Sequence, residues 1–245
     1  MTVQDVLQLL EQKAPLETAE SWDNAGLLVG DATAEVQRVL VALDITAEVV
    51  RQAKTVGAQL IVAHHPVIFA PLHTLPSGHP AYLLAQAGIG AVCWHTNLDK
   101  AAGGVADTLA AQLALQSVVK ADGYTRIGRL PAPLSPAQFV GLVQDTLHTR
   151  VRGCLGQGAI ETVAVFGGAI DEQSLPALLS ADACLFGECK HHVRLLCRES
   201  GKTVCEAGHF ASEHAVVEVL CTWLREAFPT LSVQAAEETA PFAVL

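Results

Sequence analysis

No stretch of the sequence contains the roughly 20 consecutive apolar residues that a membrane-spanning helix needs, although 51% of its 245 residues are hydrophobic. Positive charge is also scarce, because 15 lysines and arginines stand against 25 aspartates and glutamates, which gives a net charge of −10. Nucleic-acid binding relies on lysine and arginine to neutralise phosphates. We therefore expect neither a membrane protein nor a nucleic-acid-binding protein, while an anionic substrate held through metal ions stays compatible with the charge.

Several sequence signatures are missing as well. There is no P-loop, no dinucleotide-binding glycine pattern, no G-x-S-x-G elbow and no C-x-x-C pair. Most of the seven cysteines fall inside apolar runs, which predicts small buried side chains in a reducing compartment. The N-terminal segment "MTVQDVLQLLEQK" lacks the basic start of a secretory signal, so we expect a cytoplasmic protein.

What the sequence does contain is an alternation of strands and helices. β-branched strands are expected at 38–44, 58–63 and 89–94 in a first half, and at 162–170, near 183–189 and near 203–207 in a second half. Helices with capping residues at one end and glycine at the other separate these strands. This alternation predicts an α/β fold with two related lobes, each a mostly parallel sheet flanked by helices.

The segment between the halves has a different character. It is expected to contain a strand in "GYTRIGRL", a proline-rich connector, and a helix that Ser135 caps and that ends near His148. We therefore expect a first lobe over 1–120, a connecting strand–helix segment over 121–160 and a second lobe over 161–245.

Histidines follow the expected strands in both halves. His64 and His65 follow one strand and His95 follows the next, while the second half repeats the pattern with two further histidines and then His209. An acid stands four residues after each of the last histidines, at Asp99 and Glu213. Any one of these histidines is more often structural, but the combination predicts a metal site at the carboxyl ends of the strands. The rings of the first pair converge on one ion or serve two neighbouring ions.

Five motifs in order resemble the NGG-interacting-factor-like family, whose members are also described as type 2 homologues of GTP cyclohydrolase I. These motifs are "SWDNAGLLVG", "AHHPVIF", "HTNLDKAAGGVADTLA", "GECKHH" and "GHFASE". The resemblance implies a two-lobed α/β subunit with a dinuclear metal site between the lobes, and a homohexameric ring. By position, the metal ligands that it implies are His64, His65, Asp99, His209 and Glu213.

The resemblance leads to a first functional hypothesis, a hydrolase that uses two divalent ions (Zn, Fe or Mn) to activate water against a nucleotide or a related phosphorylated substrate. His95 is then a candidate proton shuttle. Further candidates for substrate contact or acid–base chemistry are Glu188, His191 and His192. The alternative hypothesis is a metal-binding regulatory protein or metallochaperone without catalysis.

Overall fold

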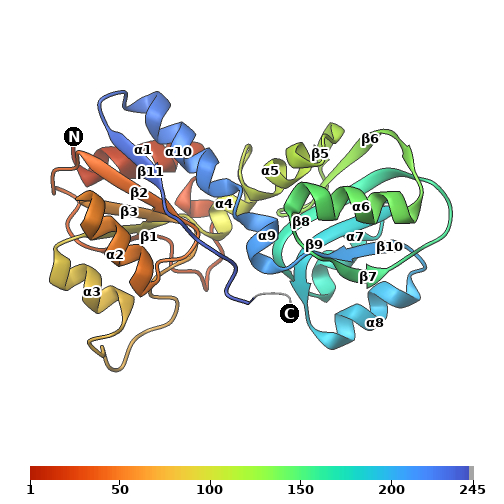
Figure 1. Ribbon diagram of the computed structural model, residues 1–245, viewed down its shortest axis with the longest axis horizontal. Coiled ribbons are helices and arrows are strands. Elements are labelled where there is room, and N and C mark those ends of the chain that lie inside the picture. The colour runs from red at the N-terminus through yellow and green to blue at the C-terminus, as the bar shows by residue number, and fades with distance from the viewer. Residues whose placement is uncertain (243–245) are drawn as a thin grey trace. The chain divides into compact units, whose positions relative to one another are not determined.

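The computed structural model describes residues 1–242, which divide into two compact units (Figure 1). The first unit comprises Met1–Gly104 and Val216–Thr239. The second unit comprises Val105–Ala215, with residues 240–242 also assigned to it. Each unit contains one sheet with helices on both faces, so the expected α/β fold with two lobes is confirmed.

The sheet of the first unit has five strands in the order β1-β4-β3-β2-β11. All neighbouring strands are parallel except the edge strand β1, which runs antiparallel to β4. The elements of this unit are α1 (Val3–Lys13), η1 (Leu16–Thr18), β1 (Gly26–Val29), β2 (Arg38–Ala42), α2 (Ala47–Val56), β3 (Leu60–Ala63), α3 (Pro80–Ala87), β4 (Gly90–Cys93), α4 (Thr96–Lys100), α10 (Val216–Ala227) and β11 (Ser232–Ala235).

The local sequence explains why these elements form where they do. The side chains of β3 and β4 are completely buried, as expected for apolar runs that have helices on both sides. Thr46 accepts a hydrogen bond from the backbone N–H of Val49 at the start of α2, and Gly57 ends that helix in the left-handed conformation, with φ = 70°. Helices α2 and α3 cover one face of the sheet, and α1 and α10 cover the other (Figure 1).

The sheet of the second unit has six strands in the order β5-β6-β8-β9-β10-β7. Its three central strands β8, β9 and β10 are parallel, while β5, β6 and β7 pair antiparallel with their neighbours, so this sheet is mixed. Its elements are α5 (Val105–Gln112), β5 (Gln116–Lys120), β6 (Arg126–Leu134), α6 (Pro136–Leu147), β7 (Arg152–Cys154), β8 (Ile160–Ile170), η2 (Glu172–Ser174), α7 (Leu175–Leu178), β9 (Ala183–Cys189), α8 (His191–Glu199), β10 (Thr203–Glu206) and α9 (His209–Glu213).

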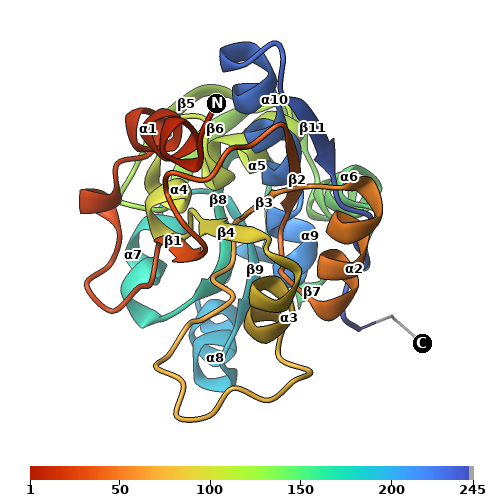
Figure 2. The same cartoon turned by 90° about the vertical axis from the view of Figure 1, so that its left-hand side faces the viewer.

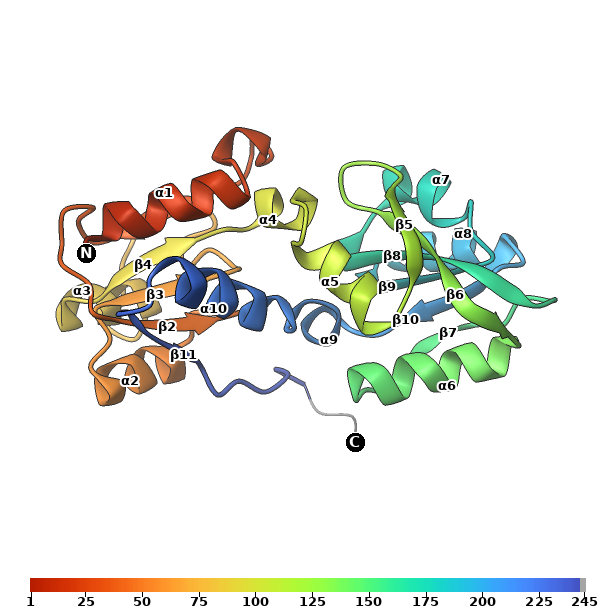
Figure 3. The ribbon, with the colours of Figure 1, turned by 90° about the horizontal axis from the view of Figure 1, so that it is seen from above.

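Helices cover both faces of this second sheet as well. Helices α5 and α6 pack on one face, and α7 and α8 pack on the other. Figure 3 shows α7 and α8 on the opposite side of the strands from α6. The helix that we expected after Ser135 is α6, with a capping box between Ser135 and Gln138.

The bounds of the two units differ from the expected lobes in two places. The segment 121–160 is part of the second unit rather than a connector, because β6 pairs with β8, β7 pairs with β10, and α6 packs on the second core. Two helices, α9 and α10, follow β10, and the boundary between the units lies between them. Chain from beyond residue 215 thereby returns to the first unit, where β11 pairs with β2.

The expected internal repeat is present in the order of the elements. Strands β2, β3 and β4 are sheet neighbours in chain order, and so are β8, β9 and β10. A helix is the next element after each of the six strands, although a long loop over residues 64–79 precedes α3 and the short helix η2 precedes α7. The histidine pairs follow the middle strand of each triplet, and His95 and His209 follow the last strand. The strand order therefore places each group of histidines at the carboxyl edge of its own sheet.

Two expectations from composition can also be compared with the structure. All seven cysteines are free thiols, and each is buried except the half-buried Cys154, as expected for small apolar side chains. Burial raises the pKa of the Cys205 thiol to about 12, which keeps it protonated at neutral pH. No helix in the described part of the chain has the length and apolar character needed to cross a membrane.

Candidate metal centre

Three imidazoles gather at the carboxyl edge of the first sheet. The backbone N–H groups of His64 and His65 continue the sheet ladder past the end of β3, with hydrogen bonds of 3.2 and 2.9 Å to the carbonyls of Ala42 and Leu43. His95 follows β4, the neighbouring strand. One nitrogen from each of the three rings lies within 4.8 Å of the other two, which is close enough for shared metal ligation.

The Nδ1 atoms of the His64 and His65 rings each contact a hydrogen-bond acceptor. His64 is completely buried, and its Nδ1 donates to the carbonyl of Trp94 at 3.0 Å. The Nδ1 of His65 lies 2.8 Å from Asp44 Oδ1. Since a carbonyl or a carboxylate can only accept, each Nδ1 carries a proton, and in the neutral ring Nε2 carries the lone pair. A partner of this kind behind a ring is the usual arrangement for histidine ligands of metals.

The loop that carries Asp44 is stabilised by Glu238, which lies in the second segment of the first unit, Val216–Thr239. The carboxylate of Glu238 accepts hydrogen bonds from the backbone N–H groups of Leu43 and Asp44, at 2.7 and 2.9 Å. Residues 43 and 44 directly follow β2, which pairs with β11 near the other end of the chain. The orientation of His65 therefore depends on Glu238, which lies 194 positions after Asp44 in the sequence.

His95 is held in the same way by Asp23. Its Nδ1 lies 2.7 Å from Asp23 Oδ1, and Thr96 donates to the other carboxylate oxygen through its hydroxyl group at 2.5 Å and its backbone N–H at 3.1 Å. The Asp23 side chain is completely buried. Burial raises the pKa of this carboxyl, but the hydrogen bonds from His95 and Thr96 outweigh burial and hold the pKa well below its ordinary value. Asp23 is therefore ionised, and its carboxylate orients the His95 ring through Nδ1.

Asp99 supplies a carboxylate to the cluster of imidazoles. Residues Thr96–Lys100 form the short helix α4, which begins directly after His95. Asn97 helps to cap this turn, since its Oδ1 accepts from the backbone N–H of His95 at 3.1 Å. The helix places Asp99 Oδ1 3.5 Å from His64 Nε2.

The second unit carries a smaller group with the same chemistry. His209 and Glu213 are the first and last residues of α9, and His209 Nε2 lies 3.0 Å from Glu213 Oε2. The other ring nitrogen, Nδ1, lies 2.9 Å from Glu188 Oε1 at the end of β9. Glu213 is almost completely buried, whereas His209 and Glu188 are partly exposed. The expected spacing of four residues does place both side chains together.

A glycine bulge in the second sheet makes room for Glu213. Phe166 pairs with Phe186 and Ala169 pairs with Glu188, so Gly167 and Gly168 together lie opposite Gly187. Gly168 has φ = 73°, the left-handed conformation typical of a bulge. A Cβ atom on Gly168 would overlap Glu213 Oε1 and would lie 3.2 Å from Glu213 Cδ and 3.3 Å from His209 Nε2. The bulge therefore fixes how deeply this carboxylate enters the unit.

His191 and His192, two of the expected catalytic residues, begin α8 and have exposed side chains. His192 Nε2 lies 3.4 Å from Glu172 Oε1. Neither belongs to a group of potential metal-ligating side chains within residues 1–242. The structure thus brings together His209, Glu213 and Glu188, and leaves this histidine pair at the surface.

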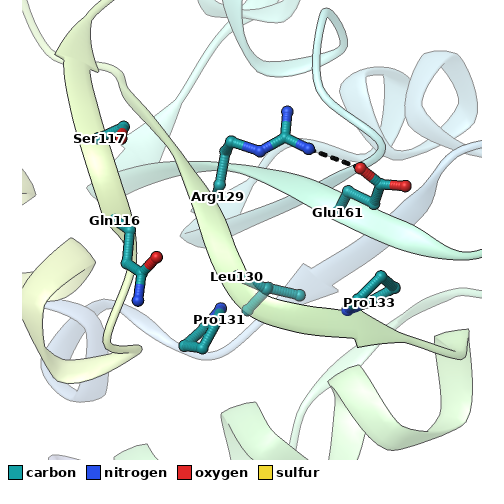
Figure 4. A pocket seen from close by; sticks show the side chains of 7 residues that line it. All are labelled: Gln116, Ser117, Arg129, Leu130, Pro131, Pro133 and Glu161. Atoms are coloured by element: carbon teal, nitrogen blue, oxygen red, sulfur yellow. Dashed lines mark hydrogen bonds and ion pairs between the residues drawn. The ribbon is translucent and has the colours of Figure 1, made fainter.

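A hollow of about 260 Å³ lies elsewhere on the second unit, at β5 and β6 (Figure 4). An ion pair of 2.6 Å joins Arg129 and Glu161 at its wall. None of the candidate site residues lines it, and its lining residues are Gln116, Ser117, Arg129, Leu130, Pro131, Pro133 and Glu161.

The sequence did not identify the side chains that orient the imidazoles. Asp23 is 72 positions from His95, and Asp44 is 21 positions from His65, so no local spacing links them. The available signal was weak, because Asp23 stands in the motif "SWDNAGLLVG" and Asp44 at the end of an expected strand, and neither position indicates a histidine partner.

Proteins of known sequence resemble this chain over nearly its whole length. A "GTP cyclohydrolase 1 type 2 homolog" from Clostridium perfringens is 30% identical over 232 residues, which cover 89% of this chain and 88% of the relative. A "GTP cyclohydrolase 1 type 2" from Helicobacter pylori is 29% identical over 237 residues, with 89% and 91% covered.

Solved structures show the same fold. The Staphylococcus aureus protein SA1388 matches with a TM-score of 0.92 at 25% identity, covering 100% of this chain and 99% of the other. Reduced HcgD from Methanocaldococcus jannaschii matches with a TM-score of 0.83 at 24% identity, covering 96% and 97%. The family model described as Duf34/NIF3 (NGG1p interacting factor 3) matches residues 1–241. The chain therefore belongs to the Duf34/NIF3 family.

Proposed function

We propose that this protein is a hydrolase that uses two divalent metal ions and acts on a nucleotide or a related phosphorylated substrate. The observation that carries the proposal is the shared orientation of four imidazoles. Each ring of His64, His65, His95 and His209 turns Nδ1 toward a carbonyl or carboxylate oxygen, at 2.7–3.0 Å. With the proton on Nδ1, the Nε2 atom of a neutral ring can act as a ligand or a base.

The side chains present fit such ions. The proposed ligands are three imidazoles and two carboxylates, a mixture that suits Zn, Fe or Mn. His64 Nε2 and His209 Nε2 each lie beside a carboxylate oxygen, of Asp99 and Glu213 respectively, as expected for groups that share an ion. The proposed set consists of His64, His65, Asp99, His209 and Glu213.

When bound, such a pair of ions supplies Lewis acidity and a water molecule of lowered pKa. The remaining roles belong to side chains. His95 accepts a proton at Nε2, because ionised Asp23 holds the proton on Nδ1 and stabilises the imidazolium that forms. Glu188 keeps the His209 ring in position through Nδ1. His191 and His192, exposed at the start of α8, are proposed to contact the substrate.

The names of the relatives support a purine nucleotide as the substrate, with water attacking a ring carbon. The resemblance also supports a homohexameric ring as the assembly and the cytoplasm as the location. A high fraction of hydrophobic residues, 51%, agrees with extensive contacts between subunits.

Elemental analysis of protein purified without chelators tests the proposal. We expect two ions per chain in the native protein and a sharp loss in His65→Ala, because removal of a ligand leaves the shell incomplete. His73→Ala is the matched control, since His73 is an exposed histidine in the loop that follows β3. Full metal content in His65→Ala would contradict the ligand assignment.

A panel of nucleotides then tests catalysis with the metal-loaded protein. Turnover of at least one nucleotide that is lost in His95→Ala supports a hydrolase. Two bound ions without turnover of any nucleotide would instead favour the metal-binding protein without catalysis.

A further inference from the structure

Two large aromatic side chains are exposed beside the imidazole cluster of the first unit. Trp22 is 59% exposed and Phe69 is 57% exposed, although only 5% of the residues in the chain are aromatic. Among the described residues, the only other aromatic side chain that is more than half exposed is Phe242. Apolar surface in contact with water is unfavourable, and burying it against a ligand releases free energy. Two exposed rings side by side are therefore a candidate binding site.

The two rings form a corner with His95. The ring centroids of Trp22 and Phe69 are 6.0 Å apart, with an angle of 61° between the planes. His95 lies 6.4 Å from Trp22 and 6.3 Å from Phe69, again edge to face. The imidazole of His95 in turn lies 5.4 Å from His64 and 5.6 Å from His65. The corner is therefore continuous with the proposed metal site.

Hydrogen bonds hold the two loops that carry these rings. Asn24 Nδ2 donates to the carbonyl of Ile68 at 2.5 Å, which ties the residue two places after Trp22 to the residue before Phe69. Asp23 fixes the first loop to His95 and Thr96. Phe69 belongs to the long loop between β3 and α3, which extends beyond the sheet in the view of Figure 2. The rings are thus held near their positions before any ligand binds.

From this arrangement we infer that Trp22 and Phe69 bind the flat heteroaromatic ring of the substrate. The inference rests on the proposed function and adds the site at which the base of the proposed nucleotide substrate binds. A corner of two ring planes accepts a base by stacking on one face and by edge contact with the other. A base bound there lies beside His95 Nε2, the proposed proton acceptor.

The choice of a base over a protein partner follows from the surroundings of the corner. Its third wall is an imidazole backed by a buried carboxylate. The neighbouring groups are His64, His65 and Asp99, which suit metal ions, and phosphates through those ions, rather than an apolar protein surface. A nucleotide combines a stacking ring with a phosphate, so it matches both parts.

Binding of guanosine and of ribose 5-phosphate to the full-length protein tests the inference. Guanosine binding is measured on chelator-treated protein. For Phe69→Ala, the measurement is the quenching of tryptophan fluorescence. For Trp22→Ala, which lacks the tryptophan of the site, the measurement is calorimetry. We expect each variant to bind guanosine about 5- to 150-fold more weakly, the range that corresponds to the stacking of one base. The matched control is Leu72→Ala, an exposed apolar residue of the same loop, which should bind guanosine as the native protein does.

Ribose 5-phosphate separates this inference from the proposed function. Metal-loaded Trp22→Ala should bind it as the native protein does, with unchanged metal content. Weaker guanosine binding in Trp22→Ala supports the base site even if no nucleotide is ever hydrolysed. Unchanged guanosine binding in both aromatic variants would overturn the base site while leaving the metal-dependent hydrolase intact. A changed native mass of Trp22→Ala with unchanged guanosine binding would show that the corner is a contact between subunits.

Discussion

The replacement Gly168→Ala should strongly weaken metal binding at Glu213 without unfolding the protein. Gly168 lies in the bulge of β8, and a Cβ atom there would overlap Glu213 Oε1. Separating a methyl group from that oxygen requires a movement of about 1 Å. Metal–ligand distances tolerate only about 0.2 Å. We therefore expect metal affinity to fall by at least about 100-fold, the upper end of the losses found when only the orientation of a ligand is disturbed.

The cost to folding can be worked out separately. Alanine in the left-handed conformation costs about 1–2 kcal/mol relative to glycine. Overpacking against Glu213 adds about 1–3 kcal/mol, so metal-free Gly168→Ala should lose about 2–5 kcal/mol in total. Because domains are stable by about 5–15 kcal/mol, we expect the variant to fold.

Gly201→Ala is the matched control for this prediction. Gly201 has φ = 68°, close to the 73° of Gly168, but a Cβ atom there would meet nothing within 4 Å. It should therefore lose only the conformational part, about 1–2 kcal/mol, and keep its metal. Urea unfolding of the metal-free proteins and competition with a fluorescent zinc indicator measure the two effects. Equal metal affinity in both variants would refute the role given to the bulge.

Three further outcomes are expected. His95→Ala should retain more metal than His209→Ala in elemental analysis while losing about 10–100-fold in activity; complete metal loss in both would make His95 a ligand. Asp23→Asn should destabilise the metal-free protein by about 1.5–3 kcal/mol at pH 7, because it weakens the charge-assisted bonds to His95 and Thr96. The pKa of Asp23 is lower in the folded state than in the unfolded state, where it is near 4. The difference in the free energy of unfolding between the native protein and Asp23→Asn should therefore persist above about pH 4 and shrink as the pH falls below it. If urea unfolding gave the same difference from pH 6 to pH 3, the charge of Asp23 would not be its cause. The native mass should be six times the 25.8 kDa of one chain; a monomer in light scattering at micromolar concentration would contradict the ring.

The strands and their histidines could be predicted because their signals are local. Apolar runs such as "LIVA" end where imidazoles begin, and residues such as Thr46 and Gly57 mark the ends of helices. Strand order then follows from the handedness of parallel connections, which brings His64 and His95 to one edge of a sheet. The alternation of strands and helices, the residues that cap the helices and the handedness of the connections are enough to predict this part of the fold.

The features that could not be predicted all depend on partners far away in the sequence. The two glycines in "FGGAI" form a bulge filled by Glu213, a residue 45 positions later. Pro131 and Pro133 resembled a connector, but they lie in β6, where its pairing with β8 is interrupted between Arg129 and Leu134. Proline is tolerated in a strand at such a point because no ladder hydrogen bond is lost.

The brace that Glu238 provides for the Asp44 loop has a consequence for synthesis of the protein on the ribosome. The segment 105–215 emerges as one continuous piece, whereas the first unit needs both Met1–Gly104 and Val216–Thr239. At about 5–20 residues/s, the ribosome takes roughly 6–22 s to make the intervening segment. Throughout this interval β2 lacks its neighbour β11, and the loop that orients His65 lacks its brace. The second unit can thus complete its fold first, and the histidine cluster of the first unit becomes ready to load metal only when β11 and Glu238 have left the exit tunnel.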